Sequence, residues 1–515
     1  MKIKNYIFLY FILQSVGISA QYGNEWIDYS KPHFKINISS PGIQRINASV
    51  LNSVGLNFVN SDNFQLFRDG KQVPIYINKT GSSVNFIEFF GYGNDGVMDS
   101  TVFKNKDWQI HDKISLFSNG AVYFLTFNDL GGNLRIIDIP NSLTNLPAKE
   151  AYYMHTSTVT YSGSYSFGEP SYMGGENDPL YSSLFNKGEG FMGTTSQQVN
   201  NNTTTRVFNV STPYKFNSTS VTAKLNSVII GWTKNEHHFK LKTGNTNINE
   251  FHFSDFDQIK SEDLLANSLI NTTTAITVEA VSTSTGTNRN TLALLEIEYP
   301  RLFNFDNASF FKFSIEGNGN VQYLELTNVN NQVTQPILYD ITNGFKLKAL
   351  DAVSATVFRY ALPAAVGKRE LVFRADNLAN YYSVSSLSEF YFKDYSTSLN
   401  QGNYIILSHS SLIASSELLA YKSYRNTIAG GSFNVEVVDV NELYNQFAYG
   451  IDHHPMAVRN FAAFSKDTWV DNPKYIFIIG KGREYQEYIS NTTVRNACLV
   501  PTFGQPGSDN LLVAD

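Results

Sequence analysis

Between residues 404 and 482, three short apolar segments alternate with helical patterns, which happens nowhere else in the chain. YIILS at 404–408, FNVEVVDV at 433–440 and KYIFIIGKG at 474–482 are rich in β-branched residues and are bounded by polar or glycine positions. Such segments are typical of strands covered on both faces. The alternation predicts a parallel, doubly wound sheet with right-handed crossovers.

Helical patterns fill both spaces between these strands. The first begins behind Ser410 and Ser411, which are candidate caps, and ends at Gly430. The second space holds two helices, one behind a candidate cap at Asn441 and one starting near Pro455, a residue favoured in a first helical turn.

A parallel sheet of this kind places its chemistry at the carboxyl ends of its strands. The positions to inspect are therefore Ser408–His409–Ser410, Asp439 and Gly480–Lys481–Gly482. The last of these does not match a phosphate-binding loop, since a Walker loop needs four residues between its Gly and Gly-Lys, and the dinucleotide fingerprint needs glycine where Tyr485 stands. A strand-to-loop turn with close backbone approach is the better interpretation.

The chain before residue 400 is predicted to be mostly β. Short alternating runs separated by Gly, Asn and Asp predict an N-terminal β domain at residues 21–150 and a β-sandwich region at 151–400, with a linker near 381–400. The α/β domain then occupies residues 401–515. The Gly, Tyr and Ser-rich stretch at 161–193 shows no clean period and is expected to be a long packed loop.

Composition restricts the class of protein. Hydrophobic residues make up 42% of the 515 positions and charged residues 16%, which favours a globular product of several domains. A net charge of -6 without a Lys/Arg stripe disfavours nucleic acid as a partner. No segment approaches the roughly 20 apolar residues of a spanning helix, so no transmembrane helix is expected.

The first 20 residues have the pattern of a secretory signal peptide. Lys2 and Lys4 precede an apolar run at 6–13, and Ser19 and Ala20 are small residues before Gln21. Export and cleavage after Ala20 are therefore predicted.

Cys498 is the single cysteine, which excludes an intramolecular disulfide framework. A nucleophile is one interpretation, and a small buried residue near a strand at 497–500 is the favoured one. A thiolate needs a base and an orienting group within hydrogen-bond reach, and scattered histidines specify no such pairing.

Metal ligands are weakly indicated. Asn94, Asp95 and Asp99 offer oxygen ligands in one loop, but the loop lacks EF-hand spacing, and a turn is favoured. The pairs His237–His238 and His453–His454 lack a Cys or HExxH partner, and adjacent strand residues face opposite ways. No metal and no cofactor are predicted.

The C-terminal pattern resembles the opening of a gingipain-type cysteine peptidase domain. YIILSHSSL, LLAYKSYRN, VEVVDVNELYNQFAYG, HHPMAVRNF, YIFIIGKG and PGSDNLLVAD carry this resemblance. Upstream, FIEFFGYGNDG, KISLFSNGAVYFLTF, LLEIEYPR and GNGNVQYLEL resemble the β region of exported members linked to type IX secretion, some of which act as sortase-like signal peptidases. The resemblance implies a caspase-like α/β fold, protein or peptide substrates, type IX secretion components as partners, and an outer-membrane-associated, cell-surface or extracellular location.

The family's catalytic motifs are absent from this sequence. Its histidine lies in a Gly-His-Gly setting and its nucleophile in a Cys-x-Asn-Gly setting, and neither setting occurs here. His409, His453, His454 and Cys498 do not match those positions, so no catalytic residue is carried over. The chain is expected to hold the β domains and the first half of the peptidase domain, to be inactive alone, and to have its catalytic residues beyond Asp515. The alternative is a cell-surface adhesion or glycan-binding β protein without enzymatic activity.

Overall fold

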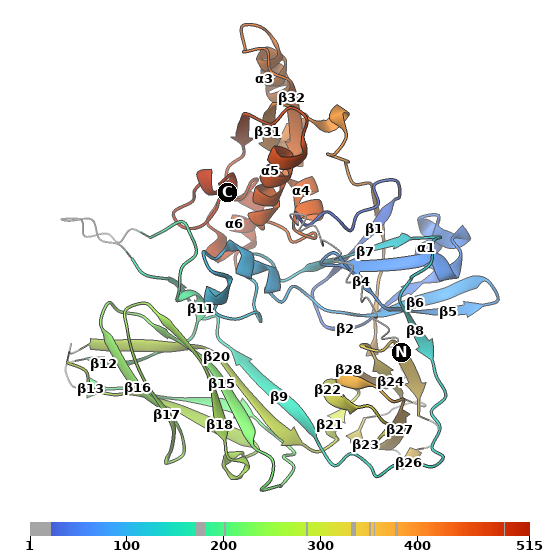
Figure 1. Cartoon of the computed structure of the whole chain (residues 1–515), viewed down its shortest axis with the longest axis vertical. Helices are drawn as coiled ribbons and strands as arrows, with labels where there is room; N and C mark the ends of the chain where they lie inside the picture. The colour runs from blue at the N-terminus through green and yellow to red at the C-terminus, as the bar shows by residue number, and fades with distance from the viewer. Residues whose placement is uncertain are drawn as a thin grey trace, which may run out of the picture.

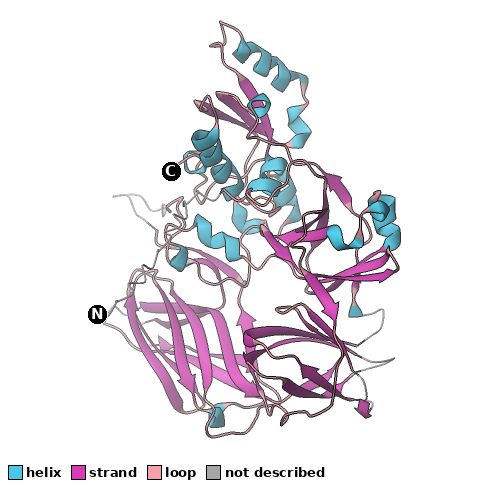
Figure 2. Ribbon diagram, turned by 45° about the vertical axis from the view of Figure 1, so that its right-hand side comes forward, coloured by secondary structure: helices cyan, strands magenta, loops and turns pink. Residues whose placement is uncertain are grey.

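Strands dominate the chain up to residue 390, and the α-helices of the described residues, apart from α1 (Ala48–Ser53), follow residue 409 (Figure 1, Figure 2). The structure is a computed structural model that describes residues 22–170, 181–199, 202–284, 287–330, 336–349, 352–354, 356–375, 380–488 and 490–514. The predicted signal peptide lies outside these residues. The predicted fold class, a β region followed by an α/β unit, is confirmed.

The N-terminal sandwich pairs a five-stranded sheet with part of a nine-stranded sheet. Alternation in HFKINI turns Phe34, Ile36 and Ile38 inward, where they pack with Phe89 from the opposite sheet. The five-stranded sheet has the order β30 (Ser388–Phe390), β1 (His33–Ile38), β7 (Ala121–Phe127), β3 (Phe64–Arg68) and β4 (Lys71–Val73).

The nine-stranded sheet extends beyond this sandwich. Its other half forms one wall of a further sandwich, which we call the third sandwich because most of its strands follow the middle sandwich along the chain. The order of the nine-stranded sheet is β22 (Phe310–Asn318), β28 (Val366–Arg374), β24 (Ile337–Asp340), β25 (Phe345–Lys348), β8 (Arg135–Asp138), β5 (Ile75–Thr80), β6 (Ser83–Gly91), β2 (Gly42–Asn47) and β29 (Tyr382–Ser383). The opposite wall of the third sandwich is β21 (Asn304–Ala308), β23 (Gln322–Val329), β27 (Val357–Leu362) and β26 (Ala352–Ser354).

Strand β8 joins the two halves of this sheet, because it pairs in parallel with β5 on one side and β25 on the other. The sheet therefore runs across the boundary predicted at residue 150. Local alternation indicates that a strand exists, but it does not say which distant strand will pair with it.

The middle sandwich, residues 153–301, has its own pair of sheets. Its long strand β20 (Thr287–Arg301) pairs with β9, β12 and β15, and Leu292, Leu295 and Ile297 of β20 are buried in the core. The first sheet contains β9 (Tyr153–Thr160), β13 (Asn202–Thr203), β12 (Thr195–Val199), β20, β15 (Ala223–Gly231) and β18 (Gln258–Leu265), and the second β14 (Thr205–Ser211), β19 (Thr273–Ala280), β16 (Glu236–Thr243) and β17 (Thr246–Ser254).

The segment 151–400 thus contains the middle sandwich and most of the third, and it adds β29 and β30 to the sheets of the N-terminal sandwich, where the sequence predicted a single sandwich region. Within the stretch expected to be a long loop, β10 (Ser164–Phe167) and β11 (Glu189–Met192) form an antiparallel pair.

The α/β unit, residues 404–514, is built on three parallel strands in the order β32 (Val435–Asp439), β31 (Tyr404–Ser408) and β33 (Tyr475–Ile479). All five residues of the central strand β31 are buried. Tyr404 and Ile406 pack toward helix α3 (Ser416–Asn426), while Ile405 and Leu407 pack in the cluster that includes α4 (Val440–Phe447) and α5 (Met456–Thr468). Helices on both faces are the arrangement that the sequence predicted.

The helices differ in detail from the prediction. The first helical segment is two helices, α2 (Ser410–Ile413) and α3, and α3 is capped by Ser415, whose hydroxyl accepts from the Leu418 N–H at 3.3 Å. Asp439, not Asn441, caps α4. No helix of the described residues is long and apolar enough to cross a membrane.

The α/β unit shares its largest apolar core with the β region. Phe103 and Phe117 of the N-terminal part and Phe185 of the middle part are buried together with residues of α4 and α5 and with Tyr485 and Phe503. We call this contact the junction: residues 97–117, Tyr165 and residues 184–191 on one side, and the α/β unit on the other.

The predicted linker near 381–400 is also packed. Strand β30 extends the five-stranded sheet by pairing with β1, and Leu387, Phe392 and Tyr395 are buried. The segment that leads into the α/β unit is therefore packed along its length, because these three side chains lie in the apolar clusters of the N-terminal sandwich and of the junction.

Candidate functional site

The carboxyl edge of the parallel sheet brings all three predicted positions together, because Ser408 lies opposite Asp439 on one side and Ile479 on the other. The strand order places a topological switch point between β31 and β33, where ligands bind in open α/β sheets. The Ser408 hydroxyl at the end of β31 donates to the carbonyl oxygen of Ile479 at the end of β33, at 2.6 Å. Residues 408–410 and 480–482 are therefore neighbours across this edge.

The polar side chains at this edge cap the helices that follow the strands. His409 Nδ1 accepts from the Ser411 N–H at 3.2 Å and caps α2. Asp439 Oδ1 accepts from the Asn441 N–H at 3.0 Å, and the Asn441 amide donates to the Ser410 hydroxyl at 3.1 Å. These contacts give the predicted edge residues a structural role in the helix starts.

The predicted close backbone approach at Gly480–Lys481–Gly482 is present. A Cβ on Gly482 would lie 2.5 Å from Thr502 Cγ2, and one on Gly480 would lie 3.3 Å from Val500 Cβ. The Leu499 N–H donates to the Lys481 carbonyl at 2.8 Å. Glycine is needed here because segment 498–502 lies against the loop.

Cys498 lies beside this loop and is deeply buried. It follows helix α6 (Thr492–Ala497), which corrects the strand expected at 497–500. The residue is 3% exposed, and its Sγ lies 3.0 Å from the Tyr488 hydroxyl. Burial raises the pKa of the Cys498 thiol, so the thiol is protonated at neutral pH.

His453 lies next to Cys498, but it contacts the backbone instead of the sulfur. Its Nε2 is 3.1 Å from the Cys498 carbonyl oxygen, and its Nδ1 is 2.8 Å from Asp452 Oδ1. Arg495 pairs with Asp452 at 2.7 Å. Although burial alone would raise it, the contacts with His453 and Arg495 hold the pKa of Asp452 below its usual value. This cluster joins α6 to the loop before α5 and does not activate the thiol.

His454 points the other way, into the junction. It is fully buried, its Nε2 lies 3.4 Å from Asp99 Oδ1, and its ring packs 4.6 Å from that of Phe117. Asp99 also accepts from the Leu116 N–H. The predicted loop candidate Asp99 is therefore a junction residue.

The other two residues of that loop serve its own turns, which is the interpretation that the sequence favoured. Asn94 Oδ1 accepts from the Gly96 N–H at 3.0 Å, and Asp95 Oδ1 accepts from the Val97 N–H at 3.2 Å.

Glu189 is a second buried carboxyl group at the junction, and the sequence did not single it out. It is 2% exposed and accepts from the Asn186 N–H at 3.0 Å, from the Tyr165 hydroxyl at 3.5 Å and from the Tyr485 hydroxyl of the α/β unit. Burial raises the pKa of Glu189 to about 8. Its two tyrosine partners lie 24 and 296 residues away along the chain, so no local pattern could have identified it.

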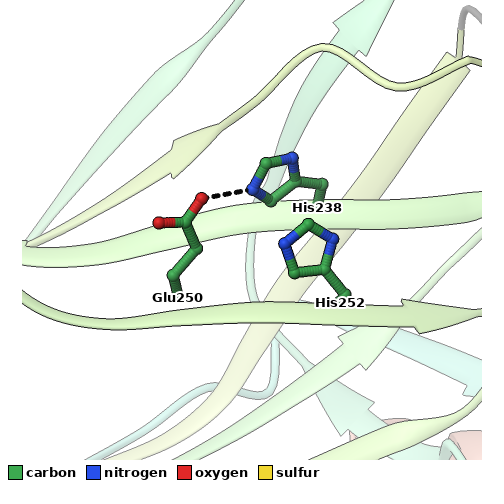
Figure 3. A group of neighbouring side chains, drawn as sticks. All are labelled: His238, Glu250 and His252. Carbon is green, nitrogen blue, oxygen red and sulfur yellow. Dashed lines mark hydrogen bonds and ion pairs between the residues drawn. The ribbon is translucent and has the colours of Figure 1, made fainter.

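The histidines at 237 and 238 separate onto two faces, as the sequence predicted. His237 is buried and contacts Asn288 Oδ1 at 3.1 Å. His238 lies on the solvent side beside Glu250 and His252 (Figure 3). Within the described part of the chain, these three form the one group of three or more His, Cys, Asp or Glu side chains whose ligand atoms gather closely enough to hold a metal ion. Period-two spacing of Glu250 and His252 was the signal that could have found it.

Comparison with known proteins defines the class of the C-terminal unit. Residues 397–514 match the family model described as peptidase family C25, the gingipain family, and this range contains all three parallel strands. The resemblance deduced from the sequence is confirmed.

The β region and the α/β unit together are similar to a solved relative, dimeric latent PorU from Porphyromonas gingivalis. The identity is 16% and the TM-score 0.56, and the match covers 95% of this chain and 46% of that chain. This chain thus spans less than half the length of PorU and shares its fold over that part.

A further likeness is too weak to bear on the fold. A CBM36-1 domain of a multidomain xylanase from the hindgut metagenome of Trinervitermes trinervoides is 15% identical over 28% of this chain and 95% of that domain, with a TM-score of 0.16. No curated protein matches the sequence.

Proposed function

We propose that this chain is the N-terminal part of an exported gingipain-type cysteine endopeptidase, with protein or peptide substrates and a role in type IX secretion. The observation that carries the proposal is the parallel sheet β32-β31-β33 inside a segment that matches peptidase family C25. An adhesion protein has no need of a doubly wound unit, so this sheet favours the peptidase over a glycan-binding surface protein.

The β region supports the same assignment. It packs against one side of the α/β unit through the junction, and the two regions together share the fold of part of PorU. This likeness and the signal-peptide pattern support the proposal of export, of an outer-membrane or cell-surface location and of type IX secretion components as partners.

We infer that the catalytic thiol and imidazole are supplied by residues outside these 515. Cys498 is buried and protonated, and the imidazole of His453 contacts its carbonyl oxygen instead of its sulfur. An acyl-transfer site needs a thiolate beside a base and an oxyanion hole. Strand β33 lies at the sheet edge, where Tyr475 and Phe477 are 54% and 40% exposed, so a further strand carrying such groups can pair there.

The experiment compares four proteins in a thiol-dependent peptidase assay on a fluorogenic peptide library: this 515-residue chain, a chain extended by the residues encoded after Asp515, and the Cys498→Ala variant of each. Activity confined to the extended chain, and unchanged there by Cys498→Ala, supports the proposal. Cleavage by the 515-residue chain that disappears in Cys498→Ala contradicts it and makes Cys498 the nucleophile. An extended chain that folds but cleaves nothing favours the binding protein.

A further inference from the structure

The solvent face of the β16–β17 hairpin gathers His238, Glu250 and His252. Alternation along β16 turns Phe239 inward and His238 outward. The hairpin register places His238 directly opposite His252. Glu250 lies two residues from His252, on the same face of β17, and therefore occupies the position diagonal to His238.

The side chains converge on one another (Figure 3). His238 Nε2 lies 2.6 Å from Glu250 Oε1, and the two imidazole rings stack with their centroids 3.8 Å apart. One ligand atom from each residue lies within 4.8 Å of the others. Rotations about the side-chain torsions would bring these atoms to a common centre at the roughly 2.0–2.2 Å typical of Zn²⁺ bonds to nitrogen and carboxylate oxygen.

From this geometry we propose that His238, Glu250 and His252 form a binding site for a divalent transition metal of the Zn²⁺ type. Two imidazoles and one carboxylate suit zinc and its first-row neighbours, whereas Ca²⁺ and Mg²⁺ prefer sets made of oxygen alone. Three protein ligands leave a fourth position to water. Glu250 and His252 are exposed, so an ion reaches the site directly from solvent.

The surrounding charges define how strongly the site competes for an ion. Lys240 neighbours His238 on the outer face of β16, and its Nζ lies 3.7 Å from Glu250 Oε1. In the absence of metal, this ammonium group pairs with the Glu250 carboxylate. It would repel a cation bound there. Lys242 is paired with Glu279 on β19 and is turned toward that partner. Lys240 is therefore the neighbour whose removal should strengthen binding.

The position of the site indicates what a bound ion does. Strand β17 is the outermost strand of its sheet, held by β16 alone within that sheet. The pairing of the two strands is irregular between Leu241 and Lys242, close to the site. A metal bound by residues of both strands would fasten this edge hairpin, because dissociation of the strands would then also break metal bonds.

The test is calorimetric titration of the purified 515-residue chain with Zn²⁺ alone, with His252→Ala and Glu250→Gln as ligand variants. His409→Asn is the matched control, because it removes a histidine elsewhere and keeps an N-cap side chain. We expect one Zn²⁺ per chain, affinity reduced about 10-fold or more in each ligand variant, since even outer partners of metal ligands cost roughly 10–100-fold, and unchanged affinity in His409→Asn.

Two further measurements separate coordination from loose surface binding. Lys240→Ala should bind Zn²⁺ more tightly, and a Co²⁺-loaded chain should show the visible absorption bands of a low-coordinate nitrogen and oxygen site, which His252→Ala abolishes. Since imidazole must be deprotonated to bind, affinity should fall on acidification. No binding by the folded chain, or equal affinity in His252→Ala, Glu250→Gln and the parent, overturns the proposal. Because these residues lie at the surface, circular dichroism of each variant checks that it remains folded.

Discussion

The middle sandwich and the α/β unit bury their apolar residues in different ways. The core of the middle sandwich is made of residues 159–299 alone, among them Phe239, Ile276 and Leu295. The main core of the α/β unit includes Phe103, Phe117 and Phe185, none of which belongs to that unit. The comparison teaches that a doubly wound pattern in the sequence does not make an independent domain, since part of its helical layer is covered by the β region.

Separate expression of the two regions should show the largest effect. We expect residues 150–303 to give a cooperative unfolding transition, whereas residues 401–514 alone should be aggregation-prone or poorly ordered, because the surface that covers α4 and α5 is missing. Thermal unfolding and proton NMR dispersion measure this. A stable, cooperatively folded 401–514 fragment would show that the junction is not required.

Truncation of matched phenylalanines sharpens the comparison. Phe117 and Phe239 are 1% and 0% exposed, so Phe117→Ala and Phe239→Ala should each cost about 3–5 kcal/mol. Phe117→Ala should loosen the contact of the α/β unit with the β region, because Phe117 packs on His454 and Tyr485. Phe239→Ala should destabilise only the middle sandwich.

Hydrogen exchange followed by mass spectrometry reports the location of each effect. Faster exchange at α4 and α5 is expected in Phe117→Ala and not in Phe239→Ala. The same pattern in both variants would mean that the two regions unfold as one.

The junction should also depend on pH through Glu189. Its pKa in the folded protein, about 8, lies above the ordinary value of 4.5, so the protonated carboxyl contributes stability that is fully present below about 4.5 and is lost as pH rises through about 8. The slope approaches about 1.4 kcal/mol per pH unit in this window. Tyr165 and Tyr485 stay neutral there, because burial raises the pKa of both.

Denaturant unfolding of the full 515-residue chain between pH 5 and pH 9 measures this dependence. Hydrogen exchange at α5 reports the unfolding of the α/β unit. Glu189→Gln should remove the slope, whereas Glu262→Gln on the exposed face of the middle sandwich should leave it. A slope that persists in Glu189→Gln would assign it to another group.

The smallest effect is expected from the Tyr488 hydroxyl, which contacts Cys498 Sγ. Tyr488→Phe removes a hydrogen bond of 2.7 Å to the Arg483 carbonyl and the contact with Sγ, and should cost about 1 kcal/mol. Tyr475→Phe is the matched control, since that residue is 54% exposed and should change stability little. Urea unfolding compares the two variants. An unchanged midpoint in Tyr488→Phe would show that the Tyr488 hydroxyl does not stabilise this loop.

Local patterns predicted elements more reliably than their partners. The sequence predicted the three parallel strands, the helices on both faces and the close approach at Gly482. Each of these features depends on hydrophobic periodicity, on β-branched residues or on a missing Cβ. The cap at Asp439 was missed because Asn441, two residues on, is an equally good capping residue. The helix α6 before Cys498 was missed because its six residues hold too little periodicity.

The sequence by itself determined the order of the parts: a β region followed by an α/β unit whose residues 397–514 match peptidase family C25. Only the tertiary structure decided which side chains meet. Glu189 and Tyr485 are 296 residues apart, Asp99 and His454 come from different units, and His252 faces His238 only through the hairpin register. Period and composition report the environment of one residue at a time, whereas these contacts depend on strand register and on the docking of distant segments.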